Sequence, residues 1–179
     1  HLLSLKPDDR YLRFGYPATD EQIRRYVGGL NFDRDEIFGV FNRRLELVAV
    51  AHFAFSVDPQ WATCAEFGVS VASHQRGKGL GGRLFKHAVM HARNQGVNMV
   101  FIHALSENVA MLKIARHAGA KVQRDGGESE AYLTLPQATL DSQLSGLMQE
   151  QMAELDYQYK NQARQFRAWL ATVQEIRQG

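Results

Sequence analysis

The stretch QRGKGLGG at residues 75–82 constrains the fold of this chain more than any other part of the sequence. It interleaves glycines with cationic side chains: Arg76, Gly77, Lys78, Gly79, Leu80, Gly81, Gly82 and then Arg83. Glycines let a backbone approach a ligand without interference from Cβ atoms, and free amides at the start of a helix attract an anion. A β-rich run precedes the stretch and an amphipathic pattern follows it. The sequence therefore predicts a strand–loop–helix unit whose loop holds a pyrophosphate.

Two familiar nucleotide motifs fit this stretch poorly. Gly77, Gly79 and Gly82 satisfy the dinucleotide fingerprint G-x-G-x-x-G, but that fold requires an acidic residue about 20 positions later, at the end of the next strand. The strand expected there, MVFIHAL, carries His103 and no acid. The ATP-type loop requires a lysine followed by serine or threonine, whereas Lys78 is followed by Gly79. A solvated glycine turn without a ligand is the remaining alternative.

The composition is that of one folded domain with a small appendage. The chain has 179 residues, of which 45% are hydrophobic and 22% charged, and its formal net charge is +2. That charge is too small to predict a nucleic-acid partner. The single cysteine, Cys64, excludes an internal disulfide and favours a reducing compartment. The first residues do not resemble a signal peptide and no apolar run suits a membrane helix, so we expect a cytoplasmic protein with no membrane partner.

Helical and strand patterns alternate along the chain. Apolar residues at helical spacing are followed by glycine at several positions, as at Gly15 and Gly96. Two β-rich runs flank NRR, which indicates a hairpin with Arg43 and Arg44 at its tip. We expect helices within 8–17, 19–30, 81–95 and 106–119, and strands within 2–9, 35–56, 63–73, 98–105 and 120–136.

The composition changes after Pro136. From Leu144 onward apolar residues recur at steps of three and four, which predicts an amphipathic helix of about 35 residues. We therefore expect a domain at 1–137 and a helical extension at 138–179. The apolar stripe of this extension needs cover. Pairing with a second chain as a homodimer, or with a helical partner, is favoured over folding back on the domain.

The glycine stretch resembles the acetyl-CoA signature of the GNAT superfamily of N-acetyltransferases, which is Arg or Gln, two residues, Gly, one residue, then Gly or Ala. In this chain the signature is RGKGLG, residues 76–81. The later stretch ENVAMLKIARHAGA resembles the second cofactor motif of the family, in which an Asn (here Asn108) opens a helix that closes on a glycine (here Gly119). The resemblance covers roughly three quarters of the chain. Within the family, the chain is most similar to bacterial domains of the protein-lysine-acetylating type.

The resemblance implies an α/β (mixed α+β) fold with a central, mixed, twisted sheet flanked by helices. The parallel strands AEFGVSV and NMVFIHAL would splay apart around the pantetheine arm of acetyl-CoA, the acetyl donor. Backbone groups of Val69 and Val71 would bind pantetheine and the acetyl carbonyl, and amides of 77–82 would hold the pyrophosphate. The helices that carry Tyr11, Phe14 and RRYV would flank the acceptor groove. The implied cofactor-binding residues are Val69, Val71, Arg76, Gly77, Lys78, Gly79, Leu80, Gly81, Gly82 and Asn108.

Acetyl transfer requires a base, because an amine attacks a thioester only when neutral and alkylamines are protonated at neutral pH. Glu66, on the strand beside the predicted thioester, is the candidate, and an outward-facing strand residue is the alternative interpretation of this position. Glu107 is the second candidate. Many family members have a tyrosine four residues before the closing glycine of the second motif, where it protonates the leaving thiolate. This chain has Ala115 there.

Four other residues support weaker hypotheses. His87 and His91 lie four apart on one expected helix but lack an obvious third ligand, so surface positions are favoured and no metal is expected. His103 at a strand end could relay a proton, although a packed histidine is favoured. Cys64 has no evident His and Asp partners and is expected to be a buried apolar residue.

The sequence therefore predicts an N-acetyltransferase that moves an acetyl group from acetyl-CoA to a primary amine by direct attack in a ternary complex. The acceptor is a protein lysine or, alternatively, a small-molecule amine. A non-catalytic acyl-CoA-sensing or scaffolding domain is the third hypothesis, because the usual tyrosine is missing and the tail carries an apolar stripe.

Overall fold

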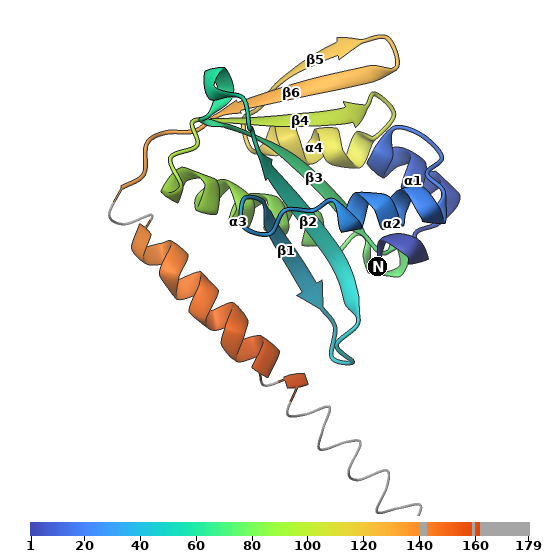
Figure 1. Ribbon diagram of the computed structural model, residues 1–179, viewed down its shortest axis with the longest axis horizontal. Coiled ribbons are helices and arrows are strands. Elements are labelled where there is room, and N and C mark those ends of the chain that lie inside the picture. Colours follow the sequence, from blue (N-terminus) through green and yellow to red (C-terminus); the bar gives the residue numbers. More distant parts are fainter. Residues whose placement is uncertain (140–142, 159, 162–179) are drawn as a thin grey trace, which may run out of the picture.

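The chain folds around a six-stranded mixed sheet with the strand order β1-β2-β3-β4-β6-β5 and with helices on both faces (Figure 1). The computed structural model describes residues 1–139, 143–158 and 160–161. Neighbouring strands are antiparallel except β3 and β4, which are parallel. The strands are β1 (Glu36–Phe41), β2 (Leu47–Phe55), β3 (Cys64–Val71), β4 (Met99–Leu105), β5 (Lys121–Asp125) and β6 (Glu128–Thr134). The helices are α1 (Pro7–Phe14), α2 (Asp20–Gly28), α3 (Leu80–Asn94) and α4 (Val109–His117), with 3-10 turns η1 (Leu2–Ser4), η2 (Pro59–Trp61) and η3 (Ser73–Gln75).

Local sequence explains where the first two helices begin and end. Pro7 starts α1, where its fixed φ suits the first turn, and Gly15 ends that helix with a φ of 79°. Thr19 and Gln22 form a capping box at the start of α2, in which each side chain accepts a hydrogen bond from the other residue's backbone amide. The helices expected within 8–17 and 19–30 are confirmed.

The helices divide between the two faces of the sheet. Phe67 on β3 packs edge-on against Phe85 of α3, with ring centroids 4.8 Å apart. The guanidinium of Arg13, in α1, lies over the next residue of β3, Gly68. Because successive strand residues point to opposite faces, α1 and α3 lie on opposite faces. The buried core on the α3 face includes Phe53, Phe67, Phe85, Val100, Ile102 and Leu112.

The parallel strands β3 and β4 are paired only near their starts. The paired residues are Cys64 with Met99, Ala65 with Val100, and Glu66 with Phe101. Beyond Glu66, β3 continues to Val71 and β4 to Leu105 without further pairing. The splay expected between these strands is therefore confirmed, and it opens where the glycine stretch follows β3.

The first residues do not form the expected strand. They form η1, because Arg10 binds the carbonyl groups that a neighbouring strand would otherwise bind. Its Nη2 donates to the Leu3 carbonyl at 2.7 Å and its Nε donates to the Leu5 carbonyl at 3.1 Å. The start of α1 at Pro7 also leaves little length for a strand.

The helix expected from Ser106 begins three residues later, at Val109. Asn108 caps it, since its Oδ1 accepts a hydrogen bond from the Met111 amide at 3.1 Å. The Ser106 hydroxyl donates instead to the Glu128 carbonyl of β6 at 2.8 Å. Ser106 thus joins β4 to β6 rather than starting the helix.

Residues 143–158 form a helix beside α3 and the β1 edge of the sheet, drawn in orange in Figure 1. Its polar side faces the domain: His87 Nδ1 and Gln149 Oε1 lie 3.1 Å apart, and His91 Nδ1 and Glu150 Oε1 lie 3.4 Å apart. His87 and His91, expected at the surface, also pack edge-on against Phe38. The expected helix is confirmed over 143–158, and its predicted continuation through 162–179 lies outside the described residues.

The apolar side of this helix is exposed. The exposed side chains are Leu144, Leu147, Met148, Met152 and Leu155. This reverses the usual arrangement, in which the apolar side of a surface helix faces the core. Among the described residues, no helix is long and apolar enough to span a membrane.

Candidate functional site

A cavity of about 1130 Å³ occupies the splay between β3 and β4. It extends from α1 across both strands to the glycine stretch, and residues of α3 and α4 complete its walls. Of Glu66 and the ten implied cofactor-binding residues, Lys78 alone is absent from the lining. The others line the cavity together: Glu66, Val69, Val71, Arg76, Gly77, Gly79, Leu80, Gly81, Gly82 and Asn108.

The backbone of the glycine stretch presents amides at one end of this cavity. Gly77 and Gly79 have φ values of 75° and 73°, a left-handed conformation that favours glycine. Gly79 caps the 15-residue helix α3, and the Arg83 amide donates to the Gly79 carbonyl at 3.0 Å. The amides of 77–82 have no acceptor among the described residues. Unpaired amides at a helix start, together with the helix dipole, form an anion site.

Gly81 permits close packing at the same end. A Cβ atom there would lie 3.1 Å from Cδ1 of Ile114 in α4, and 3.8 Å from Cγ2 of Val71. The first turn of α3 therefore lies close to α4 and to the end of β3. Gly82 differs, because a Cβ atom there would meet nothing within 4 Å.

The two cations of the stretch have different surroundings. Arg76 Nη2 lies 2.6 Å from Oδ1 of the buried Asp9 in α1, and Arg76 Nε donates to the Val71 carbonyl at 3.2 Å. Arg76 therefore fastens the loop to α1. Lys78 is exposed and its Nζ donates to Gln75 Oε1 at 2.7 Å.

The apolar and amide residues of the predicted cofactor site contribute mostly through their position. At Val69 and Val71, β3 has β2 on one side and no strand on the other. Leu80 is buried at the start of α3. Both polar atoms of the Asn108 side chain are engaged within the protein, because Oδ1 caps α4 and Nδ2 donates to the Leu12 carbonyl at 3.2 Å.

Glu66 is an exposed carboxylate at the point where the strands separate. Its neighbours Ala65 and Phe67 are buried on the opposite face, so they do not enclose it. Glu66 makes no hydrogen bond or ion pair with the described residues. Glu107, the second candidate, is also exposed and does not line the cavity.

The other candidates differ in burial and partners. Ala115 is fully buried and lies outside the cavity lining, so this position supplies no acid. His103 lines the cavity but is exposed rather than packed, with its Nε2 2.9 Å from Glu130 Oε1. The hydrogen bond from Tyr132 to the same carboxylate lowers the pKa of Glu130. Cys64 is buried as expected, and burial raises the pKa of its thiol.

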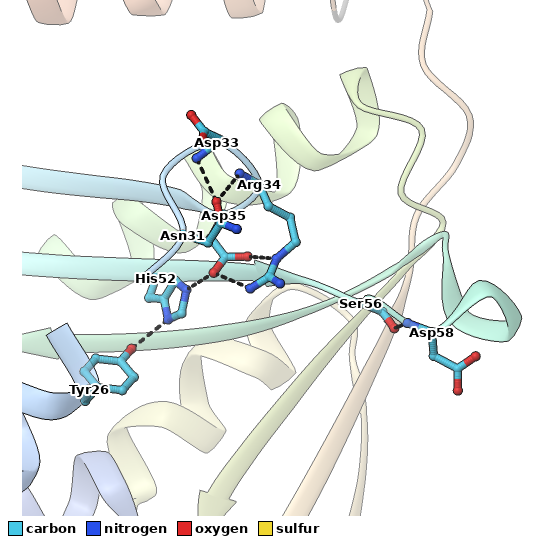
Figure 2. Close-up of polar contacts among 8 residues, drawn as sticks. All are labelled: Tyr26, Asn31, Asp33, Arg34, Asp35, His52, Ser56 and Asp58. Atoms are coloured by element: carbon cyan, nitrogen blue, oxygen red, sulfur yellow. Dashed lines mark hydrogen bonds and ion pairs between the residues drawn. The ribbon is translucent and has the colours of Figure 1, made fainter. Parts of the chain in front are cut away.

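The structure adds a connected set of side chains that sequence reasoning did not assemble. Arg13 Nη2 donates to Tyr26 Oη at 2.9 Å, and Tyr26 Oη lies 2.6 Å from His52 Nδ1. His52 Nε2 lies 3.3 Å from Asp35 Oδ2, and Arg34 donates to both oxygens of Asp35, as Figure 2 shows. Only Tyr26 belongs to a stretch that the sequence singled out, because no local spacing links these residues.

The pKa shifts of Asp35 and Tyr26 indicate the protonation state of these two side chains. Hydrogen bonds from Arg34 hold the pKa of Asp35 below its usual range, and the hydrogen bond from His52 adds to the effect. Asp35 is therefore ionised and can only accept, so His52 Nε2 donates to it. Burial raises the pKa of Tyr26, with Arg13 opposing it. Tyr26 thus remains protonated and is hydrogen-bonded to His52 Nδ1.

A second, smaller cavity of about 490 Å³ lies on the other side of this set. Tyr26, Arg34, Asp35 and His52 line it. Arg13 lines the large cavity, so the hydrogen bond between Arg13 and Tyr26 connects the linings of the two. Within the described residues, no group of three or more His, Cys, Asp or Glu side chains could hold a metal ion.

Comparison with known proteins agrees with this geometry. The model of the acetyltransferase (GNAT) family matches residues 7–120, which is more than half of the chain. The sequence matches none of the curated proteins with which it was compared.

Similar solved structures share the fold at low sequence identity. The GNAT domain of S. lividans PAT is 19% identical, with a TM-score of 0.63 over 75% of this chain and 81% of that one. A ribosomal-protein-alanine N-acetyltransferase from Brucella melitensis is 19% identical, with a TM-score of 0.60 over 75% and 92%. An N-acetyltransferase from Staphylococcus aureus Mu50 is 17% identical, with a TM-score of 0.63 over 75% and 91%.

Proposed function

Because the chain belongs to the acetyltransferase (GNAT) family, whose members transfer an acetyl group from acetyl-CoA to an amine, we propose that the cavity between β3 and β4 is its active site. The observation that carries this proposal is the pairing of two features in one cavity. Unpaired amides of 77–82 lie at one end, and the unpaired carboxylate of Glu66 lies where the strands separate.

The amides of 77–82 are proposed to hold the pyrophosphate of acetyl-CoA. They fit that group because they combine free donors with the positive end of the α3 dipole. Val69 and Val71 are proposed to bind the pantetheine arm through the backbone of β3. At these two residues β4 no longer pairs with β3, so the backbone groups on that edge are free to bind a ligand. Leu80, Gly81 and Gly82 form the floor of this end, and Asn108 holds α4 and α1 in place beside it.

Glu66 is proposed to accept the proton that the acceptor ammonium must lose before it reacts. In the ternary complex the neutral amine nitrogen bonds to the acetyl carbon of bound acetyl-CoA, the carbon–sulfur bond breaks with its electron pair going to sulfur, and the nitrogen loses one further proton to solvent as the amide forms. Glu66 is suited to this role because it lies at the cavity and has no hydrogen-bonding or ion-pair partner among the described residues. Removal of an ammonium proton by a positioned carboxylate is general base catalysis.

The leaving thiolate receives no proton from the position that carries tyrosine in many family members, because Ala115 at this position has no acidic group. We assign that proton to solvent. Thiols have a pKa of about 8.5 in model compounds, so a thiolate leaves without obligatory protonation.

The acceptor is proposed to be the primary amine of a small molecule rather than a protein lysine. Arg13 lines the cavity on the same face of β3 as Glu66. A lysine side chain would bring only a positive charge to this place, next to a guanidinium. A small amine can carry a group that complements Arg13.

The first experiment is a calorimetric titration with acetyl-CoA, with NADH as the control, followed by a thiol-release assay on a panel of small amines and lysine peptides. We expect acetyl-CoA to bind, NADH not to bind, and thiol release with small amines. Binding of NADH alone would overturn the assignment of the glycine stretch. Binding of acetyl-CoA without thiol release on any amine would support a non-catalytic domain.

We also propose the organisation of the chain. Residues 1–137 form the catalytic domain and 138–179 an extension whose apolar stripe pairs with a second copy. The apolar side chains of this helix are exposed, and its polar side is already in contact with α3, so a second copy could cover the stripe about a two-fold axis. The buried free thiol of Cys64 suits a reducing, cytoplasmic location.

The mass of the full-length protein in solution tests this pairing. We expect a dimer for the natural sequence and a monomer for the double substitution Leu147→Glu and Met152→Glu, which changes only exposed positions of the described helix. A monomeric mass for both proteins would rule out the dimer.

A further inference from the structure

Arg13 lies flat against the backbone of β3, inside the cavity. A Cβ atom at Gly68 would lie 2.8 Å from Nη2, 2.9 Å from Cζ and 3.1 Å from Nη1 of Arg13. Glycine at position 68 is therefore what allows the guanidinium to contact the strand. The rings of Phe14 and Tyr26 flank it, with centroids 5.1 Å and 5.5 Å from Cζ.

The guanidinium is held in place by a series of hydrogen bonds. Arg13 donates to Tyr26, Tyr26 is hydrogen-bonded to His52, and His52 donates to the ionised Asp35. Asp35 is buried and fixed by two further hydrogen bonds from Arg34, at 2.7 Å and 2.9 Å. Residues from α1, α2, the 31–35 loop and β2 thus cooperate to orient one cation.

Arg13 nevertheless has no carboxylate partner among the described residues. Its only hydrogen bond there is the one from Nη2 to the neutral Tyr26, so Nε and Nη1 keep their donors. This separates Arg13 from the other arginine that lines the large cavity, Arg76, which is paired with Asp9. A guanidinium presents several donors in a fixed planar arrangement that matches a carboxylate.

Glu66 lies on the same face of β3 as this guanidinium. Residues two apart on a strand point to the same side, so Glu66 projects toward the side where Arg13 covers Gly68. The Cα atoms of Glu66 and Gly68 are separated by roughly 7 Å along the strand. Glu66 and Arg13 form no ion pair with each other, so both charges remain available at the acceptor end.

We propose that the acceptor is a free amino acid, whose ammonium group binds beside Glu66 and whose carboxylate binds Arg13. In an α-amino acid one carbon separates the two charged groups. With one hydrogen bond of about 2.8 Å on each side, the molecule's reach is comparable to the roughly 7 Å between Glu66 and Gly68 along the strand. This inference rests on the proposed function and adds the chemical class of the acceptor.

The test compares each free L-amino acid with its own carboxamide as acceptor in the thiol-release assay. The two acceptors have nearly the same shape, but the amide lacks the negative charge. Loss of the carboxylate also lowers the pKa of the amine, because a nearby negative charge stabilises the ammonium form. The amide is therefore the more reactive amine in solution, and a preference for the free acid must come from the protein.

We expect the natural protein to use at least one amino acid with a kcat/KM at least tenfold above that of its amide. In Arg13→Gln this acid-to-amide ratio falls roughly 10- to 100-fold, the effect of losing a charged hydrogen-bonding partner. Arg44→Gln, which changes an exposed arginine at the tip of the β1–β2 hairpin, leaves the ratio unchanged. The ratio compares two substrates on one protein, so a partly unfolded variant still gives a valid answer.

Tyr26→Phe tests the positioning of Arg13. It removes the hydroxyl that accepts from Arg13 and keeps the ring. We expect the acid-to-amide ratio to fall by a smaller factor, about threefold to tenfold, because one neutral hydrogen bond is lost. Arg13→Lys, which keeps the charge but not the planar donors, should give a ratio between those of the natural protein and Arg13→Gln.

Three results separate the inference from the proposed function. Thiol release that favours amides or lysine peptides over free acids would overturn the amino-acid acceptor and leave the acetyltransferase assignment intact. Equal loss of activity on acids and amides in Arg13→Gln would also overturn it, because Arg13 would then act on the acetyl group. Absence of thiol release with every amine would remove the proposed function itself.

Discussion

The two ends of the large cavity are built in different ways. At the glycine end the ligand-facing groups are backbone amides of consecutive residues, 77–82, fixed by the φ values of Gly77 and Gly79. At the acceptor end the ligand-facing groups are the side chains of Arg13 and Glu66. Three residues that line the smaller cavity, Tyr26, His52 and Asp35, connect to Arg13 through hydrogen bonds. A backbone site follows from a local sequence, whereas a side-chain site exists only after the sheet and helices have assembled.

This contrast predicts different responses to substitution. A change at the acceptor end alters turnover or the stability of the assembled network, because its parts act through side chains. A change at the glycine end alters cofactor affinity, because its parts act through conformation. Substitutions that blur this distinction would show that the two ends are not functionally separate.

The largest expected effect is that of Glu66→Gln. Removing a general base lowers turnover by about 10²- to 10⁴-fold. We expect kcat to fall in this range while the Kd for acetyl-CoA stays within twofold, because the change is remote from 77–82. Steady-state kinetics and calorimetry measure the two quantities.

Glu107→Gln is the matched control for this substitution. Glu107 is exposed and outside the cavity lining, so its kcat should equal that of the natural protein. A large loss in Glu107→Gln with none in Glu66→Gln would exchange the roles of the two residues.

Asp35→Asn tests the assembled side-chain network. Asp35 is buried and accepts two hydrogen bonds from Arg34 and one from His52, so the loss of its charge should cost about 1.5–3 kcal/mol of unfolding free energy. Asp33→Asn is the control, since Figure 2 shows the Asp33 carboxylate directed away from Asp35. Denaturant titration of both variants measures the difference, and equal stabilities would contradict the network.

Asp35 also makes the free energy of unfolding depend on pH, in a direction that its pKa shift determines. The pKa of Asp35 is lower in the folded protein than in the unfolded chain, first through hydrogen bonds from Arg34. Its stabilising contribution is therefore complete above the unfolded pKa of about 3.9 and is lost as the pH falls through the folded value. The unfolding free energy of the natural protein should fall more steeply below about pH 4 than that of Asp35→Asn.

Gly79→Ala tests the conformational end. An alanine at a φ of 73° is strained by about 1–2 kcal/mol, and relief of that strain would turn the loop amides away from the cavity. We expect the Kd for acetyl-CoA to rise by about tenfold. Gly126→Ala carries a comparable strain, at a φ of 57°, in the remote turn between β5 and β6. Gly126→Ala should lose stability without losing affinity for acetyl-CoA. Similar affinities of the two variants for acetyl-CoA would show that the conformation of the glycine loop does not determine cofactor binding.

Lys78→Gln has the smallest expected effect. Lys78 is exposed, bonded only to Gln75 among the described residues, and outside the cavity lining. Its attraction for phosphate groups is screened by salt, with a Debye length of about 8 Å at physiological ionic strength. We expect a rise of about twofold to threefold in Kd that shrinks as salt is added. A tenfold rise independent of salt would indicate direct contact instead.

Local sequence predicted the glycine end and most of the fold. The strand–loop–helix unit was readable because glycine spacing, the β-rich run of 64–71 and the helical pattern of 80–94 are contiguous. The hairpins and capped helices were readable for the same reason. The failures lie where distant residues intervene, as when Arg10 takes the carbonyls of the first segment and Ser106 bonds to β6 instead of starting α4.

The acceptor end was predictable only in part. Glu66 was identified from its strand, but Arg13, Asp35 and His52 carry no spacing that relates them. They meet because β2 pairs His52 with Gly68 and because α1 crosses the same face. His87 and His91 illustrate the same limit, since a helical spacing that suggested surface positions gave no sign of the contacts with Phe38 and residues 143–158.

The most direct test of the central claim is a crystal structure of the acetyl-CoA complex. We predict pyrophosphate oxygens within about 2.7–3.2 Å of backbone nitrogens in 77–82, with the thioester at the unpaired edge of β3 beyond Glu66. A cofactor whose phosphates lie away from these amides, or whose acetyl group lies on the other side of the sheet, would contradict the account of one cavity with two ends.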